Sequence, residues 1–457
     1  MKRFVYQWLA VSSLLIAALS AVAETRPQYG GTLRVSTRSV LTSLNPQDPS
    51  QPRSTVQRNV SALIFDTLVK IDEGGRIHPG LAVSWRTASG NQRWRFQLRQ
   101  GVRFHDGTPL SVETTAAALR SVNASWNVLA DSDSVIIELN KPDTDLPAEL
   151  SLPEYAICKN GSTDRPLGTG PFRVLSWESG KKLTLAAQED YWGGRPFLDS
   201  IEIEMGRSFR DQLTAISLSR TDLAEIAPEQ LHRVSLEGQH LASSAPVELI
   251  ALVFASATRT PEEKALREAL SWSIDRESMR TVLLQGAGQP AGSLLPNWVT
   301  GYGFVFPTRT DMTLAHKERD QIRSASAWTL GYDPADPLAR LLAERISLNA
   351  KDAGLTVQPT SATSADIRLL RVPIISTDPW IALANIAGVA GFPVPSISGS
   401  TAEDLFREEN SLLSTRRIIP LFHLPQSYAA SPALRNWAVH ADGSWGILDA
   451  WLEGRRP

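Results

Sequence analysis

The alternation of side chains in residues 94–109 constrains the fold of this chain more than any other feature. Apolar and polar residues alternate over residues 94–99, which is the period of a strand with one buried face. The alternation resumes after Gly101, which permits a bend, and ends at Asp106-Gly107, a dipeptide typical of tight turns. On its own, this stretch predicts a β-hairpin.

The N-terminus has the layout of a secretory signal peptide. A basic start is followed by a mostly apolar segment over residues 9–19 and by a small-x-small cleavage motif at residues 21–23. The apolar segment is shorter than the roughly 20 residues that span a membrane, which argues against an anchor. We therefore predict a signal peptide over residues 1–23, cut between Ala23 and Glu24, and a periplasmic protein.

The composition is that of an exported globular protein with a mildly acidic surface. Removal of residues 1–23 takes away two of the 46 basic residues and none of the 48 acidic ones, so the formal net charge becomes 44 − 48 = −4. A chain without basic excess is not expected to bind nucleic acid. The remaining 434 residues (457 − 23) predict two or three domains. The sole cysteine, Cys158, is interpreted as a buried apolar side chain.

Helix and strand signals follow one another along the chain. Thr260-Pro261-Glu262-Glu263 is a capping box with proline at the first helical position. A βαβ unit is predicted between residues 326 and 357, with a helix that starts near Asp336-Pro337 and stops at Gly354. Further strands are expected over residues 30–35, 134–139, 182–188, 366–372 and 418–422, and helices over residues 111–121, 209–219 and 401–413.

Residue types that carry enzymatic chemistry are present but not arranged for catalysis. The chain has no Gly-x-Ser-x-Gly elbow and no His-Glu-x-x-His pair, and its seven histidines lack metal-ligand spacing. His105-Asp106 is interpreted as part of a turn rather than as a catalytic pair. The glycines of Gly168-Thr169-Gly170-Pro171 suit turns and close packing, because the Gly-Lys-Ser/Thr ending of a phosphate loop is missing. We predict no catalytic residues, no metal and no cofactor.

Several motifs, in order along most of the mature chain, resemble the family 5 extracellular solute-binding proteins, the peptide, nickel and oligosaccharide receptors of ABC importers. The motifs are Gly30-Gly31-Thr32-Leu33 with Leu44-Asn45-Pro46, Phe65-Asp66-Thr67-Leu68, residues 79–85 before the 94–109 stretch, Gly168–Phe172 with Tyr191-Trp192, the 267–276 helix, and Ile419-Pro420-Leu421.

The resemblance implies an α/β, two-lobed periplasmic-binding-protein fold (type II, cluster C-like) with a small inserted subdomain in lobe I. The expected division is the signal peptide over residues 1–23, lobe I over 24–59, the inserted subdomain over 60–165, lobe I again over 166–245, lobe II over 246–417, and a C-terminal return to lobe I over 418–457.

By the same resemblance, the protein captures a peptide or similar small polar ligand between its lobes. It then delivers the ligand to ABC permease subunits in the inner membrane, and it acts as a monomer. Alternatives with the same fold are a ligand-sensing receptor, a binder of nickel chelates, oligosaccharides or opines, and a degenerate receptor with weak affinity. A periplasmic enzyme is a further alternative that the residues do not favour.

Five residues are candidates for the ligand site: Arg53, Trp126, Trp298, Asp378 and Trp380. Trp126 is similar in position to a stacking tryptophan of nickel-chelate receptors, although core packing is an alternative for all three tryptophans. Peptide-binding relatives carry a Trp-x-x-Asp motif whose carboxylate holds the ammonium group of the peptide. Here Ile375 takes the place of that aspartate, so the ligand lacks a free amine or Asp378 substitutes.

Overall fold

The computed structural model describes residues 26–454 apart from Pro49, Pro52, Ser89 and a few short segments, which are residues 163–164, 237–239, 302–305, 323–326 and 394–400. The predicted signal peptide and its cleavage site therefore lie outside the described residues. Within that described part, no helix is long and apolar enough to cross a membrane.

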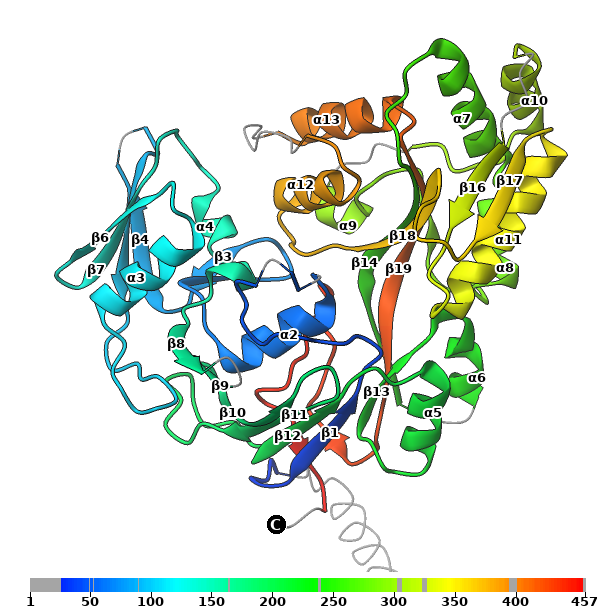
Figure 1. Cartoon of the computed structure of the whole chain (residues 1–457). Coiled ribbons are helices and arrows are strands. Elements are labelled where there is room, and N and C mark those ends of the chain that lie inside the picture. The colour runs from blue at the N-terminus through cyan, green and yellow to red at the C-terminus, as the bar shows by residue number, and fades with distance from the viewer. Residues whose placement is uncertain are drawn as a thin grey trace, which may run out of the picture.

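One mixed β-sheet of eleven described strands runs through most of the molecule (Figure 1). Its order is β10 (Phe172–Glu178), β11 (Lys182–Ala187), β12 (Ser200–Glu204), β1 (Thr32–Ser36), β13 (Leu223–Ile226), β19 (Ile418–Ala430), β14 (His240–Phe254), β18 (Ile367–Pro373), β16 (Ala327–Gly331) and β17 (Thr356–Thr360), with β15 (Gln289–Pro290) paired to β19. We call the part around β10 to β13 lobe I and the part around β16 to β18 lobe II.

The long strands β14 and β19 connect the two lobes. They pair antiparallel from His240↔Ala430 in lobe I to Val253↔Ile418 in lobe II (Figure 1). The register shifts on both sides of Pro246, which is paired with Pro425. Because proline donates no ladder hydrogen bond, the pairing is weakest there and the strands can bend between the lobes. β14 is not among the predicted strands, and the expected lobe boundary at residue 246 falls inside it.

In lobe II, both faces of the sheet are covered by helices. Ile250, Leu252 and Phe254 of β14 face a core shared with α7 (Pro261–Ser273) and α11 (Pro337–Asp352). The residues between them face a second core shared with α12 (Pro379–Val389) and α13 (Ala402–Ser414). Side chains alternate across a strand, so burial on both faces requires a continuous apolar run. The other described helices of this lobe are α8 (Arg276–Val282), α9 (Asn297–Thr300) and α10 (Met312–Asp320).

The helix ends in lobe II follow the capping signals of the sequence. The side chain of Thr260 accepts a hydrogen bond from the Glu263 N–H at the start of α7, and Thr401 does the same for Asp404 at the start of α13. Asp336 caps α11. The predicted helices and the βαβ unit β16–α11–β17, which is parallel, are confirmed.

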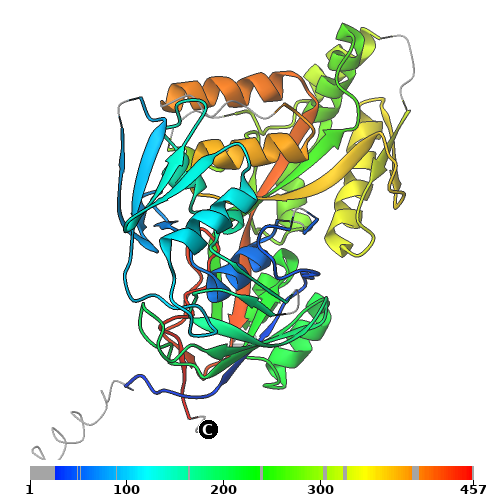
Figure 2. The same ribbon diagram turned by 60° about the vertical axis from the view of Figure 1, so that its left-hand side comes forward.

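Lobe I packs α2 (Thr55–Ile64), α5 (Phe209–Ser217) and α6 (Leu231–Leu236) around its part of the sheet. A subdomain projects from it, and Figure 2 brings this subdomain toward the viewer. The subdomain contains the sheet β4 (Ala82–Thr87), β5 (Arg93–Leu98), β7 (Ser134–Glu138), β6 (Asn127–Asp131), with α3 (Val112–Val122), α4 (Leu146–Glu149) and η1 (Pro153–Tyr155), and the short pairs β2 (Val69–Ile71) with β3 (Ile77–Pro79) and β8 (Lys159–Ser162) with β9 (Arg165–Leu167).

The predicted strand over residues 94–99 is confirmed as β5, but the hairpin is wrong. β5 pairs with β4 and with β7, so both of its edges are filled by strands from elsewhere in the chain. After Gly101 the chain leaves this sheet. The predicted tight turn at Asp106-Gly107 does form, with the bridge Arg103↔Pro109 and a hydrogen bond from the Phe104 N–H to the Thr108 carbonyl oxygen (2.8 Å). Strands β4 and β7 therefore pair with β5 in place of the residues that follow Gly101.

Three motifs converge on Asp66, where the subdomain joins lobe I. Its buried carboxylate accepts hydrogen bonds from Thr169 Oγ1 (3.2 Å), Tyr191 Oη (3.1 Å) and Trp192 Nε1 (2.8 Å). Next to it, a Cβ atom on Gly168 would lie 2.0 Å from the Ile64 carbonyl oxygen. The carboxylate and the glycine therefore serve the packing of the subdomain onto α2, as close-packing glycines are expected to do.

Candidate functional site

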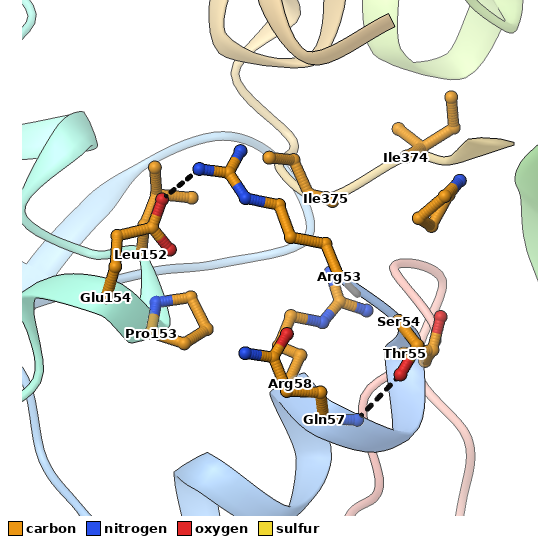
Figure 3. A pocket seen from close by; sticks show the side chains of 11 residues that line it. Arg53, Ser54, Thr55, Gln57, Arg58, Leu152, Pro153, Glu154, Ile374 and Ile375 are labelled. Carbon is orange, nitrogen blue, oxygen red and sulfur yellow. Dashed lines mark hydrogen bonds and ion pairs between the residues drawn. The ribbon is translucent and has the colours of Figure 1, made fainter. Parts of the chain in front are cut away.

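A small cavity lies where lobe I, the subdomain and lobe II meet (Figure 3). Residues 53–55, Gln57 and Arg58, at the start of α2, form one side. Residues 152–154 of the subdomain form the second side, and residues 373–375, which follow β18, form the third. The site is thus assembled from three segments that are far apart in the sequence.

Arg53 links all three parts at one edge of the cavity. Its Nη2 donates to Glu154 Oε1 in the subdomain (2.6 Å), and its Nη1 donates to Asn385 Oδ1 on α12 of lobe II (3.2 Å). The side chain is 47% exposed. An ion pair at that exposure contributes at most about 1 kcal/mol, so these contacts can exchange for contacts to a ligand at little cost.

Arg58 is more deeply placed on the same side. Its Nη2 donates to the carbonyl oxygen of Asp442, and its Nη1 lies 3.8 Å from Asp442 Oδ2, beyond hydrogen-bond distance. Its Nε is buried, and no residue in the described part of the chain accepts a hydrogen bond from it. A buried donor left without an acceptor costs about 1–3 kcal/mol. The Arg58 guanidinium is therefore ion-paired with Asp442, and its unsatisfied Nε is not accessible from the cavity.

The first turn of α2 also opens onto this cavity. Ser54 Oγ accepts a hydrogen bond from the Gln57 N–H (3.1 Å) and so begins the helix. The first turn contains no acidic residue. The positive end of the helix macrodipole is therefore not offset by a side chain of the helix itself.

The wall from lobe II is apolar and touches the subdomain. Ile375 packs against the apolar core of the subdomain, and Ile381 of α12 is a buried member of that core. Nearby, Thr377 Oγ1 donates to the carbonyl oxygen of Asp72 (3.2 Å). Lobe II and the subdomain are in direct contact along this segment, which encloses the cavity between them.

Asp378 does not line this cavity but begins α12. Its Oδ1 accepts hydrogen bonds from the N–H groups of Trp380 (2.9 Å) and Ile381 (3.0 Å), and Pro379 occupies the first helical position. Burial raises the pKa of Asp378 above its usual value, and the Asp143 carboxylate adds to the effect. Its carboxylate is therefore engaged in positioning the helix that carries Asn385.

The three candidate tryptophans pack beside the cavity rather than in it. Trp126 stacks on Tyr155, with ring centroids 5.2 Å apart. Trp298 Nε1 donates to the Pro246 carbonyl oxygen in the crossover strand (2.8 Å). Trp380, in the first turn of α12, packs against the lobe II core. Of the five candidate residues, Arg53 alone is among the residues that line the cavity.

The site residues predicted from the sequence do not include Arg58, Glu154 or Asn385. Arg53 and Asn385 are 332 positions apart, so no local pattern could relate them. One local signal did mark the site: the segment that departs from the Trp-x-x-Asp motif, residues 373–375, forms the apolar wall.

A second group of charged side chains joins the lobes beside α5, around another cavity. Arg38 Nη1 of lobe I lies 3.6 Å from Asp336 Oδ2, and Arg371 Nε approaches the same atom at 2.7 Å. Arg371 Nη1 also donates to Glu248 Oε2 (2.7 Å). The Arg38 N–H donates to Glu225 Oε2 (2.6 Å), and burial raises the pKa of Glu225 to about 7.

Groups with possible catalytic roles are held in structural contacts. His105 Nε2 is 3.1 Å from the Gly170 carbonyl oxygen, and burial lowers the pKa of the imidazole. Asp106 pairs with Lys159 Nζ at 2.7 Å. Burial raises the pKa of Cys158 to about 11, so the group is a thiol rather than a nucleophilic thiolate. Among the described residues, no three His, Cys, Asp or Glu side chains form a metal-binding group.

A match to a known protein family shows which class of protein this chain belongs to. The family model described as "Bacterial extracellular solute-binding proteins, family 5 Middle" matches residues 76–383. The chain belongs to this family. Several of its relatives are named as binding proteins, and members of the family are described as extracellular or periplasmic. The resemblance noted in the motifs is confirmed, as is the role of a family 5 solute-binding protein.

Individual relatives of this family 5 protein are distant in sequence. Protein XP55 of Streptomyces lividans is 25% identical over 86% of this chain and 78% of that protein. The probable D,D-dipeptide-binding periplasmic protein DdpA of Escherichia coli K12 is 23% identical over 63% of this chain and 61% of DdpA. The crystal structure of NikA from Staphylococcus aureus in complex with Ni(L-His)₂ has a TM-score of 0.79 at 17% identity, covering 92% of this chain and all of NikA. The predicted two-lobed periplasmic-binding-protein fold is confirmed.

Proposed function

We propose that this protein is exported to the periplasm, captures a small solute in the cavity beside Arg53, and delivers it as a monomer to ABC permease subunits in the inner membrane. The observation that carries the proposal is the pair of contacts from Arg53 to Glu154 and Asn385. A side chain that reaches both lobes across a cavity couples ligand contact to lobe closure, which is how hinge-type binding proteins enclose a ligand.

The five candidate residues have two kinds of role in this proposal. Arg53 contacts the solute directly. Trp126 supports η1 through its ring contact with Tyr155, and Trp298 braces the crossover strand at Pro246. Asp378 and Trp380 hold the start of α12, so we expect them to affect binding through Asn385.

Relatives suggest the size of the solute. DdpA is named as a dipeptide-binding protein, and NikA was crystallised with a histidine complex of nickel. We therefore propose a small solute of about the size of a dipeptide.

A thermal-shift screen of the mature chain tests the proposal. The panel contains dipeptides, N-acylated amino acids, opines, short oligosaccharides and nickel–histidine complexes. A solute that binds only the native form raises the melting temperature by mass action. At a free concentration one hundred times Kd, it adds about 2.7 kcal/mol to the free energy of unfolding. For the solute found, Asn385→Ala should weaken binding, because it removes the lobe II partner of Arg53. If no compound shifts the melting temperature, or if Asn385→Ala binds as the wild type does, this cavity is not the ligand site.

A further inference from the structure

Arg38 connects the two lobes at a place separate from the Arg53 cavity. Its Nη1 lies 3.6 Å from Asp336 Oδ2 and its Nη2 lies 3.8 Å from Asp333 Oδ2, both at the start of α11. The Arg53 cavity instead borders α12, which carries Asn385. Figure 1 shows α11 and α12 on opposite sides of β14 and β18. The lobes are therefore joined by charged side chains on both sides of these strands.

Each end of this contact is fixed within its own lobe. In lobe I, the Arg38 N–H donates to Glu225 Oε2 on β13 (2.6 Å), and the guanidinium carbon lies 5.5 Å from the ring centroid of Phe209 on α5. In lobe II, the buried Asp336 carboxylate caps α11 and lies 2.7 Å from Arg371 Nε. An ion pair with a buried partner is screened less by salt than a surface pair. The contact therefore resists separation of the lobes.

Like charges face each other across the same boundary. Among the described residues, lobe I contributes Arg38 and the carboxylates of Glu225 and Glu229, which lies in η2 (Pro228–Gln230). Lobe II contributes Arg371 and the carboxylates of three residues, which are Asp333, Asp336 and Glu248. Tyr428 of β19 also faces Glu225, with which it pairs in the sheet. Carboxylates are in excess, so their mutual repulsion opposes the ion pairs of Arg38.

Glu225 is the carboxylate of this cluster whose charge changes near neutral pH. Burial raises its pKa to about 7, and the Glu248 carboxylate adds to the effect, although hydrogen bonds from Arg38 and Gln212 act in the opposite direction. Separation of the lobes hydrates Glu225 and moves it away from Glu248, so its pKa falls toward the usual 4.5. The closed arrangement thus holds a proton that the open one releases.

We infer that Arg38 is a latch, whose ion pairs with Asp333 and Asp336 keep the lobes closed while Glu225 is protonated and yield when Glu225 ionises. Arg38 is a positioning residue, because it acts on closure and lines no part of the Arg53 cavity. This inference rests on the proposed function, in which closure captures the solute, and it adds a regulation by pH.

The sign of the pH effect follows from where the proton is held more tightly. The pKa of Glu225 is higher in the closed form, so the advantage of that form is complete below pH 4.5 and is lost as the pH rises through 7. The ratio of closed to open molecules therefore falls by up to about tenfold between pH 6 and pH 8.

Spin labels on the two lobes measure this ratio without any solute. Leu218→Cys at the end of α5 and Leu348→Cys on α11 place labels at exposed positions of lobe I and lobe II, and Cys158→Ser removes the native thiol. Double electron–electron resonance gives the distribution of distances between the labels at pH 6 and at pH 8. We expect a closed distance at pH 6 and a second, open distance that gains population at pH 8.

Variants in the labelled protein assign the effect to Glu225 and Arg38. Glu225→Gln cannot ionise, so we expect the closed distance at both pH values. Arg38→Gln removes the cation and should show the open distance at both, whereas Arg38→Lys restores the charge and should restore the pH dependence. The control is Arg435→Gln, which breaks an ion pair with Glu453 within lobe I and should behave as the labelled parent does. Thermal melting verifies that each variant is folded.

Three results overturn the latch. They are a parent protein with the same distance distribution at pH 6 and pH 8, a folded Arg38→Gln protein that stays closed, and a Glu225→Gln protein that opens at pH 8 as the parent does. Each of these leaves the solute screen and the proposed function unaffected. A screen without any binder contradicts the proposed function, whereas the label distances still decide whether the lobes respond to pH.

Discussion

Replacement of Gly168 by alanine tests whether the Gly-Thr-Gly motif serves packing. The new Cβ would lie 2.0 Å from the Ile64 carbonyl oxygen, 2.7 Å from Phe65 Cδ1 and 2.9 Å from the Ile64 carbonyl carbon. Two of these atoms belong to the backbone at the end of α2, so no side-chain rotation relieves the contact. The backbone must move by about 1 Å to restore an ordinary separation.

The cost follows from the contacts that this movement disturbs. Overpacking of a closed site costs typically about 1–3 kcal/mol. The Ile64 carbonyl oxygen also accepts the Gly170 N–H (3.0 Å), and the Gly168 carbonyl oxygen accepts the His105 N–H (3.0 Å). Loss of either bond adds about 1 kcal/mol. We therefore expect Gly168→Ala to lower the free energy of unfolding by about 3–5 kcal/mol, which lowers Tm by about 3–6 °C for a chain of this length.

Differential scanning calorimetry measures the change in Tm caused by Gly168→Ala, with Gly388→Ala as the matched control. Gly388 lies in α12, and a Cβ there would meet nothing within 4 Å. Alanine at an exposed helix position should leave Tm unchanged or raise it, since glycine is less favourable there by about 1 kcal/mol. A Gly168→Ala protein that melts within a degree of the wild type would refute the packing argument. Stabilisation of the wild type by inorganic phosphate, lost in the variant, would instead favour the phosphate-loop interpretation.

Three further predictions concern buried ionisable groups. Because burial raises the pKa of Glu225 from 4.5 to about 7, the protonated side chain stabilises the fold below pH 4.5, and this stability is lost as the pH rises through 7. Glu225→Gln should therefore flatten the pH dependence of the free energy of unfolding, measured in urea between pH 5 and 8. The same slope in both proteins would contradict this. Asp66→Ala leaves the buried Tyr191 hydroxyl and the partly buried Trp192 N–H without their acceptor, and we expect a loss of about 3–5 kcal/mol in the free energy of unfolding in the same assay. A loss below about 1 kcal/mol would show that these bonds do not hold the subdomain. Cys158 is half-buried against the core of lobe I rather than fully buried as predicted. With its pKa raised to about 11, it should react with a thiol reagent at pH 8 more slowly in the native protein than in urea, and equal rates would contradict this.

Short-range patterns predicted most helices and strands correctly because the forces that decide them are local. Thr260 and Thr401 begin helices because each hydroxyl lies within reach of a backbone N–H three residues on. Strand β14 was missed, since its continuous apolar run shows no alternation. That run reflects burial on both faces, which arises only when helices from distant parts of the chain cover the sheet.

The sequence by itself determined the family, the two-lobed fold and the apolar segment that forms one wall of the cavity, because short motifs of neighbouring residues indicate each of these. The tertiary structure alone decided which polar groups meet. Arg53 finds Glu154 and Asn385 at separations of 101 and 332 residues, and Asp378 is occupied by its own helix. Such contacts depend on how the lobes pack against each other, and packing is a property of the whole chain.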